Sequence, residues 1–155
     1  MYIIVVGGGG MKVVVMGCGR VGARVSGILD HNGHRVTVID TDSRAFRRLP
    51  SDFGGETLIG TGIDEDVLRA AGIEEAGAFV AVTNGDNRNI MAAQVARLVF
   101  EVPDVICRIY DPVREDTYRR LGLTTVCPTT SVSAVILDHV IGANEALGPA
   151  RGGGS

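Results

Sequence analysis

Short apolar runs alternate with longer segments of helical spacing along this chain. The run from Val13 to Met16 is continuous and mostly β-branched, which is typical of a strand buried on both faces of a parallel sheet. The segment from Arg20 to Asn32 has apolar residues at helical spacing, and Gly33 is expected to end this helix. The same alternation predicts strands at 35–39, 57–59, 78–82, 105–109 and 124–127, and helices at 43–49, 64–71, 86–100, 111–121 and 131–146.

Repeated strand–helix units predict an α/β fold, a doubly wound parallel six-stranded Rossmann sheet of order 3-2-1-4-5-6 with right-handed crossovers. The domain is expected to cover residues 11–148. Residues 1–10 place an apolar run and four glycines before a second methionine, and are interpreted as an extension added to the natural chain, with a genuine extra edge strand as the alternative. Residues 149–155 end in Gly-Gly-Gly-Ser and are interpreted as a linker or tag.

Helical spacing also predicts which side chains face the core. An apolar residue that recurs every three or four positions lies on one side of a helix. The first helix is expected to bury Val21, Val25, Ile28 and Leu29, the helix over 86–100 to bury Ile90, Val95, Leu98 and Val99, and the last helix to carry an apolar face of Val132, Val135, Ile136 and Val140. One domain is not expected to cover that last face fully, although a helix packed only on its own sheet is the alternative.

Three glycines follow the first strand at the spacing Gly17-x-Gly19-x-x-Gly22 and open the first helix. Gly17 permits the sharp turn, Gly19 lets the backbone approach a pyrophosphate, and Gly22 lets the helix pack closely on the strand. Free N–H groups at the start of the helix then face the phosphates. Arg20 lies inside this loop, where its charge opposes the helix dipole, so it is expected to meet a phosphate, an acidic residue of a neighbouring subunit, or solvent.

Asp40 ends the second strand, at the distance from the glycine loop that suits a ribose ligand. A carboxylate there accepts hydrogen bonds from both ribose hydroxyls and repels a 2′-phosphate, which disfavours NADP. Arg44 is nearby and keeps this exclusion from being absolute. The loop and Asp40 together predict a site for the adenosine half of a nucleotide.

Other polar residues are expected at the carboxyl edge of the sheet, where such folds bind ligands. Thr61 and Gly62 follow the third strand, and Thr83 and Asn84 follow the fourth. Asp86 is equally consistent with a ligand contact and with the N-cap of the next helix. Arg108 interrupts an apolar strand, so its charge must reach the sheet edge, where it contacts a ligand or forms an ion pair between subunits.

Composition and charge exclude several classes of function. The net charge of −3 disfavours a general nucleic-acid binder, and no apolar run approaches a membrane span. Three unpaired cysteines indicate a reducing, cytoplasmic compartment. No catalytic or metal-ligand arrangement stands out, and the histidines are interpreted as structural. Cys18 is interpreted as a small residue that fills the phosphate loop, although a helix N-terminus lowers the pKa of some thiols.

The combined pattern resembles the TrkA-N domain, also called the RCK N-terminal or KTN domain, of bacterial potassium uptake systems and some potassium channels. The stretch Thr83-Asn84-x-Asp86-x-x-Asn89 is the most specific part, because ordinary dehydrogenases lack it. The resemblance covers about residues 11–148. It rests on VVVMGCGRVG (13–22), GHRVTVID (33–40), GTGID (60–64), VLRAAGI (67–73), AVTNGDNRN (81–89) and ICRIYDP (106–112).

The resemblance implies regulation rather than catalysis. Family members bind NAD(H), ATP or ADP, and the nucleotide changes the shape of a dimer or ring that gates a membrane partner. By this resemblance the helix over 131–146 pairs two subunits, and the C-terminal ligand-sensing domain of full-length members is missing. It also implies that the glycine loop and Arg20 hold phosphate, that Asp40 holds ribose, that Thr61 lies near the adenine, and that Thr83 and Asn84 line the phosphate side.

The chain is therefore expected to be a non-enzymatic, nucleotide-sensing regulatory subunit of a potassium uptake system, at the inner face of the cell membrane. The alternatives are the cofactor half of an NAD-dependent oxidoreductase and an interaction module with a vestigial site. NAD(H) is slightly preferred over ATP or ADP. The expected nucleotide-binding residues are Gly17, Cys18, Gly19, Arg20, Val21, Gly22, Asp40, Thr41, Thr61, Gly62, Thr83, Asn84 and Arg108.

Overall fold

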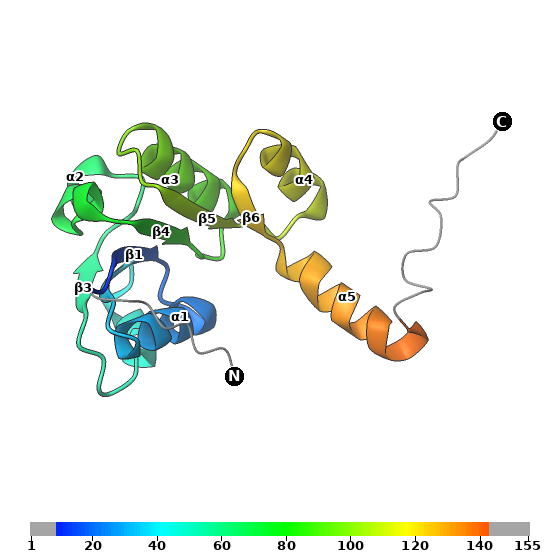
Figure 1. The fold of residues 1–155 in the computed structure, drawn as a ribbon, viewed down its shortest axis with the longest axis horizontal. Helices are drawn as coiled ribbons and strands as arrows, with labels where there is room; N and C mark the ends of the chain where they lie inside the picture. Colours follow the sequence, from blue (N-terminus) through cyan, green and yellow to red (C-terminus); the bar gives the residue numbers. More distant parts are fainter. Residues whose placement is uncertain (1–8, 143–155) are drawn as a thin grey trace.

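A six-stranded parallel sheet forms the centre of the molecule, and helices cover both of its faces (Figure 1). The computed structural model describes residues 9–142. The strand order is β3-β2-β1-β4-β5-β6, which confirms the predicted Rossmann order. The strands are β1 (Lys12–Met16), β2 (Arg35–Asp40), β3 (Glu56–Ile59), β4 (Ala78–Ala81), β5 (Asp104–Arg108) and β6 (Thr124–Val126).

The connecting segments are helical, as the spacing predicts. They are α1 (Arg20–His31), the 3₁₀ helix η1 (Ser43–Arg48), α2 (Glu65–Ala70), the 3₁₀ helix η2 (Ile73–Glu75), α3 (Asp86–Leu98), α4 (Pro112–Arg120) and α5 (Pro128–Ile141). Helix α5 begins three residues before the predicted start, because Pro128 suits the first turn of a helix. The predicted end of this helix at 146, the linker at 149–155 and most of the extension at 1–10 lie outside the described residues.

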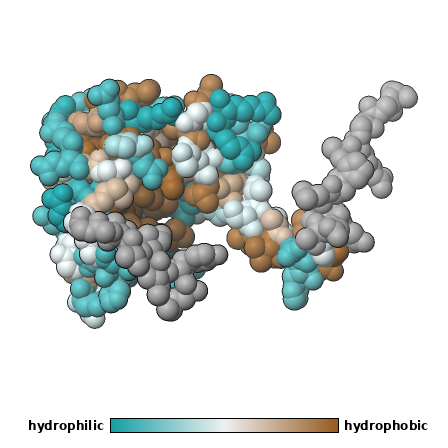
Figure 2. Space-filling view, viewed as in Figure 1, coloured by the Kyte–Doolittle hydropathy of each residue, from teal (hydrophilic) through white to brown (hydrophobic). Residues whose placement is uncertain are grey.

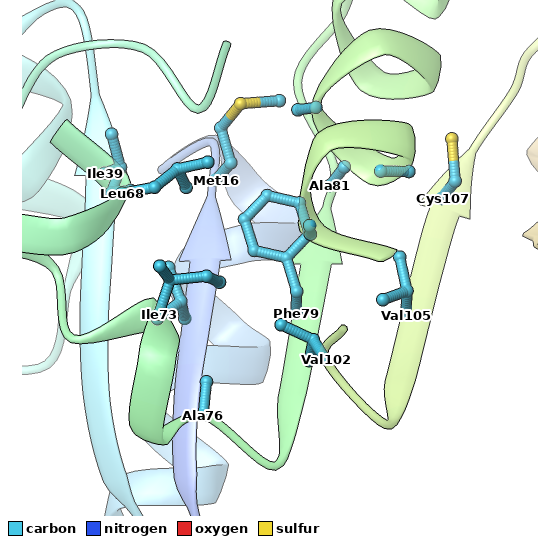
Figure 3. Close-up of a cluster of buried hydrophobic side chains, with 14 of the residues drawn as sticks. Met16, Ile39, Leu68, Ile73, Ala76, Phe79, Ala81, Val102, Val105 and Cys107 are labelled. Atoms are coloured by element: carbon cyan, nitrogen blue, oxygen red, sulfur yellow. The ribbon is translucent and has the colours of Figure 1, made fainter. Parts of the chain in front are cut away.

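The core has two layers, one on each face of the sheet. Alternate residues of β1 point to opposite faces, so Val13 and Val15 pack beneath α1 and η1, while Val14 and Met16 pack on the other side with α2 and α3. Phe79 of β4 lies in the middle of this second layer, among side chains that Figure 3 shows converging from β1, β5 and the helices. This packing fixes the ends of the strands relative to one another.

The prediction of which helix residues are buried is wrong for several large side chains. Val21 and Ile28 of α1 are 46% and 50% exposed, and Leu98 is 70% exposed with Val99 also at the surface. The faces that pack on the sheet consist mostly of small residues, Gly22, Ala23 and Ser26 in α1 and Ala92, Ala93 and Ala96 in α3. Small side chains let each helix approach the sheet closely, so the large apolar residues lie on the flanks.

Helix α5 leaves the body of the domain and buries none of its residues (Figure 1). The alternative prediction, a helix packed on its own sheet, is therefore wrong. Hydrophobic side chains lie along this helix in Figure 2. They are Val132, Val135, Ile136, Leu137, Val140 and Ile141, and all are exposed. No helix within residues 9–142 is long and apolar enough to cross a membrane.

Candidate functional site

A cavity of about 290 Å³ opens at the carboxyl edge of the sheet, where the ends of β1, β2 and β4 meet. This is the edge at which doubly wound folds bind ligands. The predicted site residues that line it are Gly17, Cys18, Gly19, Asp40, Thr41, Thr61, Thr83, Asn84 and Arg108. The other residues in its lining are Met16, Ile39, Asp42, Ala45, Arg48, Gly60, Val82 and Arg88, and the prediction missed them.

Two of the three loop glycines are required by contacts within the protein. Gly17 has a φ of +106°, and a Cβ there would lie 2.8 Å from the backbone nitrogen of Thr83. A Cβ on Gly22 would lie 1.8 Å from the carbonyl oxygen of Gly17, so this glycine permits close packing of α1 on the loop. A Cβ on Gly19 would meet nothing within 4 Å. The space beside Gly19 is thus open, and no side chain caps the N-terminus of α1 at this residue.

Asp40 supports the glycine loop directly. Its Oδ2 accepts a hydrogen bond of 2.7 Å from the backbone N–H of Cys18, and its Oδ1 accepts one of 2.9 Å from the backbone N–H of Asp42. Each carboxylate oxygen can accept a further hydrogen bond, so both remain able to receive a ribose hydroxyl. The sequence assigned Asp40 to a ligand and did not reveal this second role, because loop contacts leave no periodic signal.

A second acidic residue, Asp42, lies beside Asp40 and is paired with an arginine. The sequence predicts that Arg44 weakens the repulsion of a 2′-phosphate. In the structure its guanidinium instead pairs with the Asp42 carboxylate, with Nε and Nη2 each 3.0 Å from a carboxylate oxygen. These hydrogen bonds lower the pKa of Asp42 and keep its carboxylate ionised. Two carboxylates, Asp40 and Asp42, therefore line the same end of the cavity.

Cys18 is fully buried under the glycine loop. Burial raises the pKa of its thiol to about 11, and the charge of Asp40 adds to this effect while Arg48 opposes it. The thiol is protonated at neutral pH, which agrees with a small residue that fills the loop and not with an activated cysteine. Cys18 contributes to the site through its backbone, because its N–H donates a hydrogen bond to the Asp40 carboxylate.

The buried side chain of Asn89 ties the ends of β4 and β5 together. Its Oδ1 accepts hydrogen bonds from the backbone N–H and the hydroxyl of Thr83, at 2.9 and 2.6 Å. Its Nδ2 donates to the carbonyl oxygens of Thr83 and Arg108, both at 2.9 Å. The last asparagine of the motif therefore holds the cavity wall in shape, and Thr83 faces the cavity with its hydroxyl already engaged.

Asp86 is not the N-cap that the sequence offered as one of its two roles, and it does not line the cavity. Gly85 is the N-cap of α3, and Asp86 is the first helical residue. Its carboxylate accepts hydrogen bonds from the backbone N–H groups of Tyr110 and Asp111, at 2.9 and 3.3 Å. Asp86 thus joins the start of α3 to the segment after β5, across a separation that sequence patterns do not report.

Arg108 ends β5 and projects into the cavity lining, with only 9% of its surface exposed. Its Nη2 donates to the carbonyl oxygens of Val82 and Thr83, at 2.6 and 2.8 Å, and its guanidinium lies 4.7 Å from the centre of the Tyr110 ring. Its Nε is buried without a hydrogen-bond partner. Within residues 9–142 no carboxylate forms an ion pair with this guanidinium. A buried cation of this kind favours an anionic ligand in the cavity.

Four predicted site residues lie outside the cavity lining. Val21 and Gly22 belong to the first turn of α1, and the backbone N–H of Gly62 contacts the sulfur of Met16 at 3.2 Å. Arg20 is exposed and lines a separate groove of about 1000 Å³ between α1 and the segment after η1. Arg48 lines both the groove and the cavity, and only the structure reveals its position between them.

The TrkA-N domain family matches this chain over residues 13–129, which includes the whole cavity. The chain belongs to the TrkA-N domain family. It is 58% identical over 116 residues to the Trk system potassium uptake protein TrkA of Streptomyces coelicolor, which covers 75% of this chain and 52% of that protein. It is 30% identical over 131 residues to the TrkA homolog of Methanothermobacter thermautotrophicus, covering 84% of this chain and 60% of that protein. The chain thus spans little more than half the length of these relatives.

Solved structures share the fold of this TrkA-N domain at low sequence identity. The TrkA-N domain of the inner membrane protein ybaL from Escherichia coli is 19% identical with a TM-score of 0.71, over 83% of this chain and 96% of that one. The GsuK structure bound to ADP is 20% identical with a TM-score of 0.69, over 83% and 33%. The GsuK channel bound to NAD is 19% identical with a TM-score of 0.66, over 84% and 23%. These likenesses establish the Rossmann-type fold.

Proposed function

We propose that this TrkA-N domain binds an adenine nucleotide in the carboxyl-edge cavity and acts as the nucleotide-sensing part of a potassium uptake system. The observation that carries the proposal is Arg108, a buried guanidinium without a carboxylate partner within residues 9–142, in a cavity that also contains the uncapped N-terminus of a helix. Both features stabilise a negative charge. A phosphate group satisfies them together.

The proposed assignments follow the geometry of the cavity. The open side of Gly19 and the first N–H groups of α1, from Arg20 to Gly22, receive the phosphates. Arg108, Thr83 and Asn84 line the same cavity and approach them from β4 and β5. Asp40 and Thr41 hold the ribose, while Thr61 lies on the adenine side. Cys18 contributes its backbone. Arg48 and Arg88, which also line the cavity, add positive charge to its wall.

NAD(H) is our first choice of ligand and ATP or ADP is the alternative. They share the adenosine diphosphate group that the glycine loop and Asp40 are suited to hold. NADP is disfavoured because its 2′-phosphate would meet the carboxylates of Asp40 and Asp42. The solved GsuK structures, one bound to ADP and one to NAD, support a fold that accepts either nucleotide.

The proposed role is regulatory and not enzymatic. The cavity lining includes no histidine, and the thiol of Cys18 is held in its protonated form. The potassium uptake names of the relatives support a membrane-embedded potassium transporter or channel as partner, with this domain at the inner face of the membrane. The exposed apolar face of α5 supports pairing with the same helix of a second copy.

Calorimetric titration of the purified chain with ADP, NADH and NADPH tests the proposal. We expect ADP and NADH to bind, NADPH to bind at least tenfold more weakly, and NADH to remain chemically unchanged. Arg108→Met should weaken ADP binding about 10- to 100-fold, the loss expected for one hydrogen bond to a charged group. Arg35→Met removes the same charge at the opposite edge of the sheet and should leave binding unchanged. Absence of binding, or hydride transfer from NADH, would overturn the proposal.

A further inference from the structure

The hydrogen bonds that tie the start of helix α5 to the body of the domain converge on one carbonyl group. The hydrogen bonds that link residues 127–142 to the rest of the described chain both end on the carbonyl oxygen of Tyr110, from the hydroxyl of Thr129 at 2.7 Å and from the thiol of Cys127 at 3.5 Å. Strand β6 ends at Val126, which pairs with Arg108 in the sheet. The sheet therefore fixes where α5 begins, and the Tyr110 carbonyl fixes the direction of its first turn.

The other side of the same residue contacts Arg108, which lines the cavity. The Tyr110 backbone N–H donates to Asp86, the first residue of α3, and its aromatic ring lies against the guanidinium of Arg108. Arg108 and the Thr83–Asn84 segment before α3 both line the cavity. Tyr110 thus contacts the cavity lining through its ring against Arg108, the first residue of α3 through its N–H, and α5 through its C=O.

We infer that Tyr110 is the positioning residue through which nucleotide in the cavity sets the direction of α5. This inference rests on the proposed function, because it requires a nucleotide to act on Arg108. A phosphate attracts the guanidinium and competes with its contact to the Tyr110 ring, since both depend on the same positive charge. The Tyr110 peptide then shifts, and the Thr129 hydroxyl that it holds shifts with it.

The geometry amplifies a small movement at Tyr110. Helix α5 has 14 residues and no buried side chain that would hold it against the body. Its length is ~20 Å, so a rotation of ~10° about its first turn displaces its far end by ~3.5 Å. A movement of this size at an apolar helix that pairs two copies changes how the copies are oriented.

Spin labels at Asp138→Cys on α5 and Asp66→Cys on α2 measure this rotation as a distance between the two helices. Both positions are exposed, and the native cysteines are buried. Labelled protein is diluted into an excess of unlabelled protein so that the distance within one chain is read. With saturating ADP we expect the mean distance to change by about 2 Å or more, as the rotation estimate requires.

Two pairs of variants separate the role of Tyr110 from simple structural support. Thr129→Val removes the hydroxyl that contacts the Tyr110 carbonyl at almost constant volume, while Thr129→Ser keeps it. Tyr110→Leu removes the ring over Arg108, while Tyr110→Phe keeps it. We expect Thr129→Val and Tyr110→Leu to lose at least half of the ADP-induced change in distance and the two conservative variants to retain it. The calorimetric affinity for ADP should stay within about threefold in the Thr129 pair.

The outcomes distinguish this inference from the function on which it rests. If ADP and NADH both fail to bind in calorimetry, the proposed function is overturned, and so is the proposed coupling between nucleotide binding and the direction of α5. If a nucleotide binds but the distance does not change, or changes equally in Thr129→Val and Thr129→Ser, the role of Tyr110 is overturned while nucleotide binding stands.

Discussion

The carboxylate of Asp40 and the backbone N–H of Cys18 are joined by a hydrogen bond of 2.7 Å between the end of β2 and the glycine loop. The residue that is proposed to hold the ribose therefore also holds the loop that is proposed to hold the phosphates. An ionised acceptor makes this a strong hydrogen bond. Loss of Asp40 consequently affects the shape of the site itself as well as its proposed ligand contacts.

Replacement of Asp40 should lower both stability and nucleotide affinity. Asp40→Ala removes two acceptors of backbone N–H groups and should reduce the free energy of unfolding by about 2–4 kcal/mol, since a hydrogen bond to a charged group contributes about 1.5–3 kcal/mol and the two share one carboxylate. The affinity for ADP should fall at least tenfold. Urea denaturation and calorimetry measure the two effects. Asp40→Asn retains one acceptor oxygen and should lose less stability, and an Asp40→Ala protein that binds ADP normally would refute the ribose assignment.

Gly19 and Gly22 allow the ligand contribution to be separated from the packing contribution. Gly22→Ala places a methyl group 1.8 Å from the Gly17 carbonyl oxygen and should destabilise the domain strongly, by about 3 kcal/mol or more, or prevent folding. Gly19→Ala meets no protein atom within 4 Å and has an ordinary φ of −77°, so stability should change by less than about 0.5 kcal/mol.

The decisive measurement for the glycine pair is ADP binding by Gly19→Ala. A methyl group beside the open side of the loop should weaken binding at least tenfold, although the protein is as stable as the parent. If Gly19→Ala binds ADP as tightly as the parent, the phosphates do not lie against this part of the loop.

The fold could be predicted because each part of it leaves a local signal. Continuous β-branched runs mark buried parallel strands, and the strand order follows from a common topology once six strand–helix units are counted. The contact faces of α1 and α3 were mispredicted because spacing highlights large residues such as Ile28 and Leu98, whereas close packing on the sheet selects glycine and alanine.

The candidate site could be predicted only in part, for a different reason. The glycine loop and Asp40 follow strands directly, so their position at the sheet edge is readable from the sequence. The contacts of Asp86 with Tyr110 and of Asn89 with Arg108 span 24 and 19 residues, and Arg48 reaches the cavity from a 3₁₀ helix. Such contacts depend on how the strand ends meet in the folded sheet, and the spacing of residues along the sequence does not predict this.

The exposed face of α5 provides a test of pairing between copies. Val135 and Val140 are 71% and 70% exposed, so Val135→Lys with Val140→Lys should not lower the stability of a single domain by more than about 0.5 kcal/mol. If α5 pairs two copies, the charged variant should sediment as a monomer at concentrations where the parent is a dimer. Ser131→Lys changes an exposed residue of the same helix and should leave the dimer intact. Equal sedimentation of the parent and the double variant would exclude this helix as the interface.

The buried cysteines predict how stability depends on alkaline pH. Burial raises the thiol pKa of Cys18 to about 11 and of Cys107 to about 12, from 9.0 in an exposed thiol. At neutral pH both thiols are protonated whether the chain is folded or unfolded, so they cause no pH dependence there. Above pH 9 the unfolded chain releases these protons and the folded chain does not, so the free energy of unfolding falls as the pH rises towards 11. Denaturation at pH 8, 9 and 10 measures this slope.

Cys18→Ala should reduce the alkaline slope, since it removes one of the two thiols that titrate only after unfolding. Every other side chain is the same in both proteins, so the difference between the slopes isolates Cys18. Alkylation gives an independent reading, because the thiolate is the reactive form: Cys18 of the folded chain should react far more slowly than an exposed thiol at pH 8. Rapid alkylation of Cys18 at neutral pH, with the protein fully folded, would contradict its burial beneath the loop and its raised pKa.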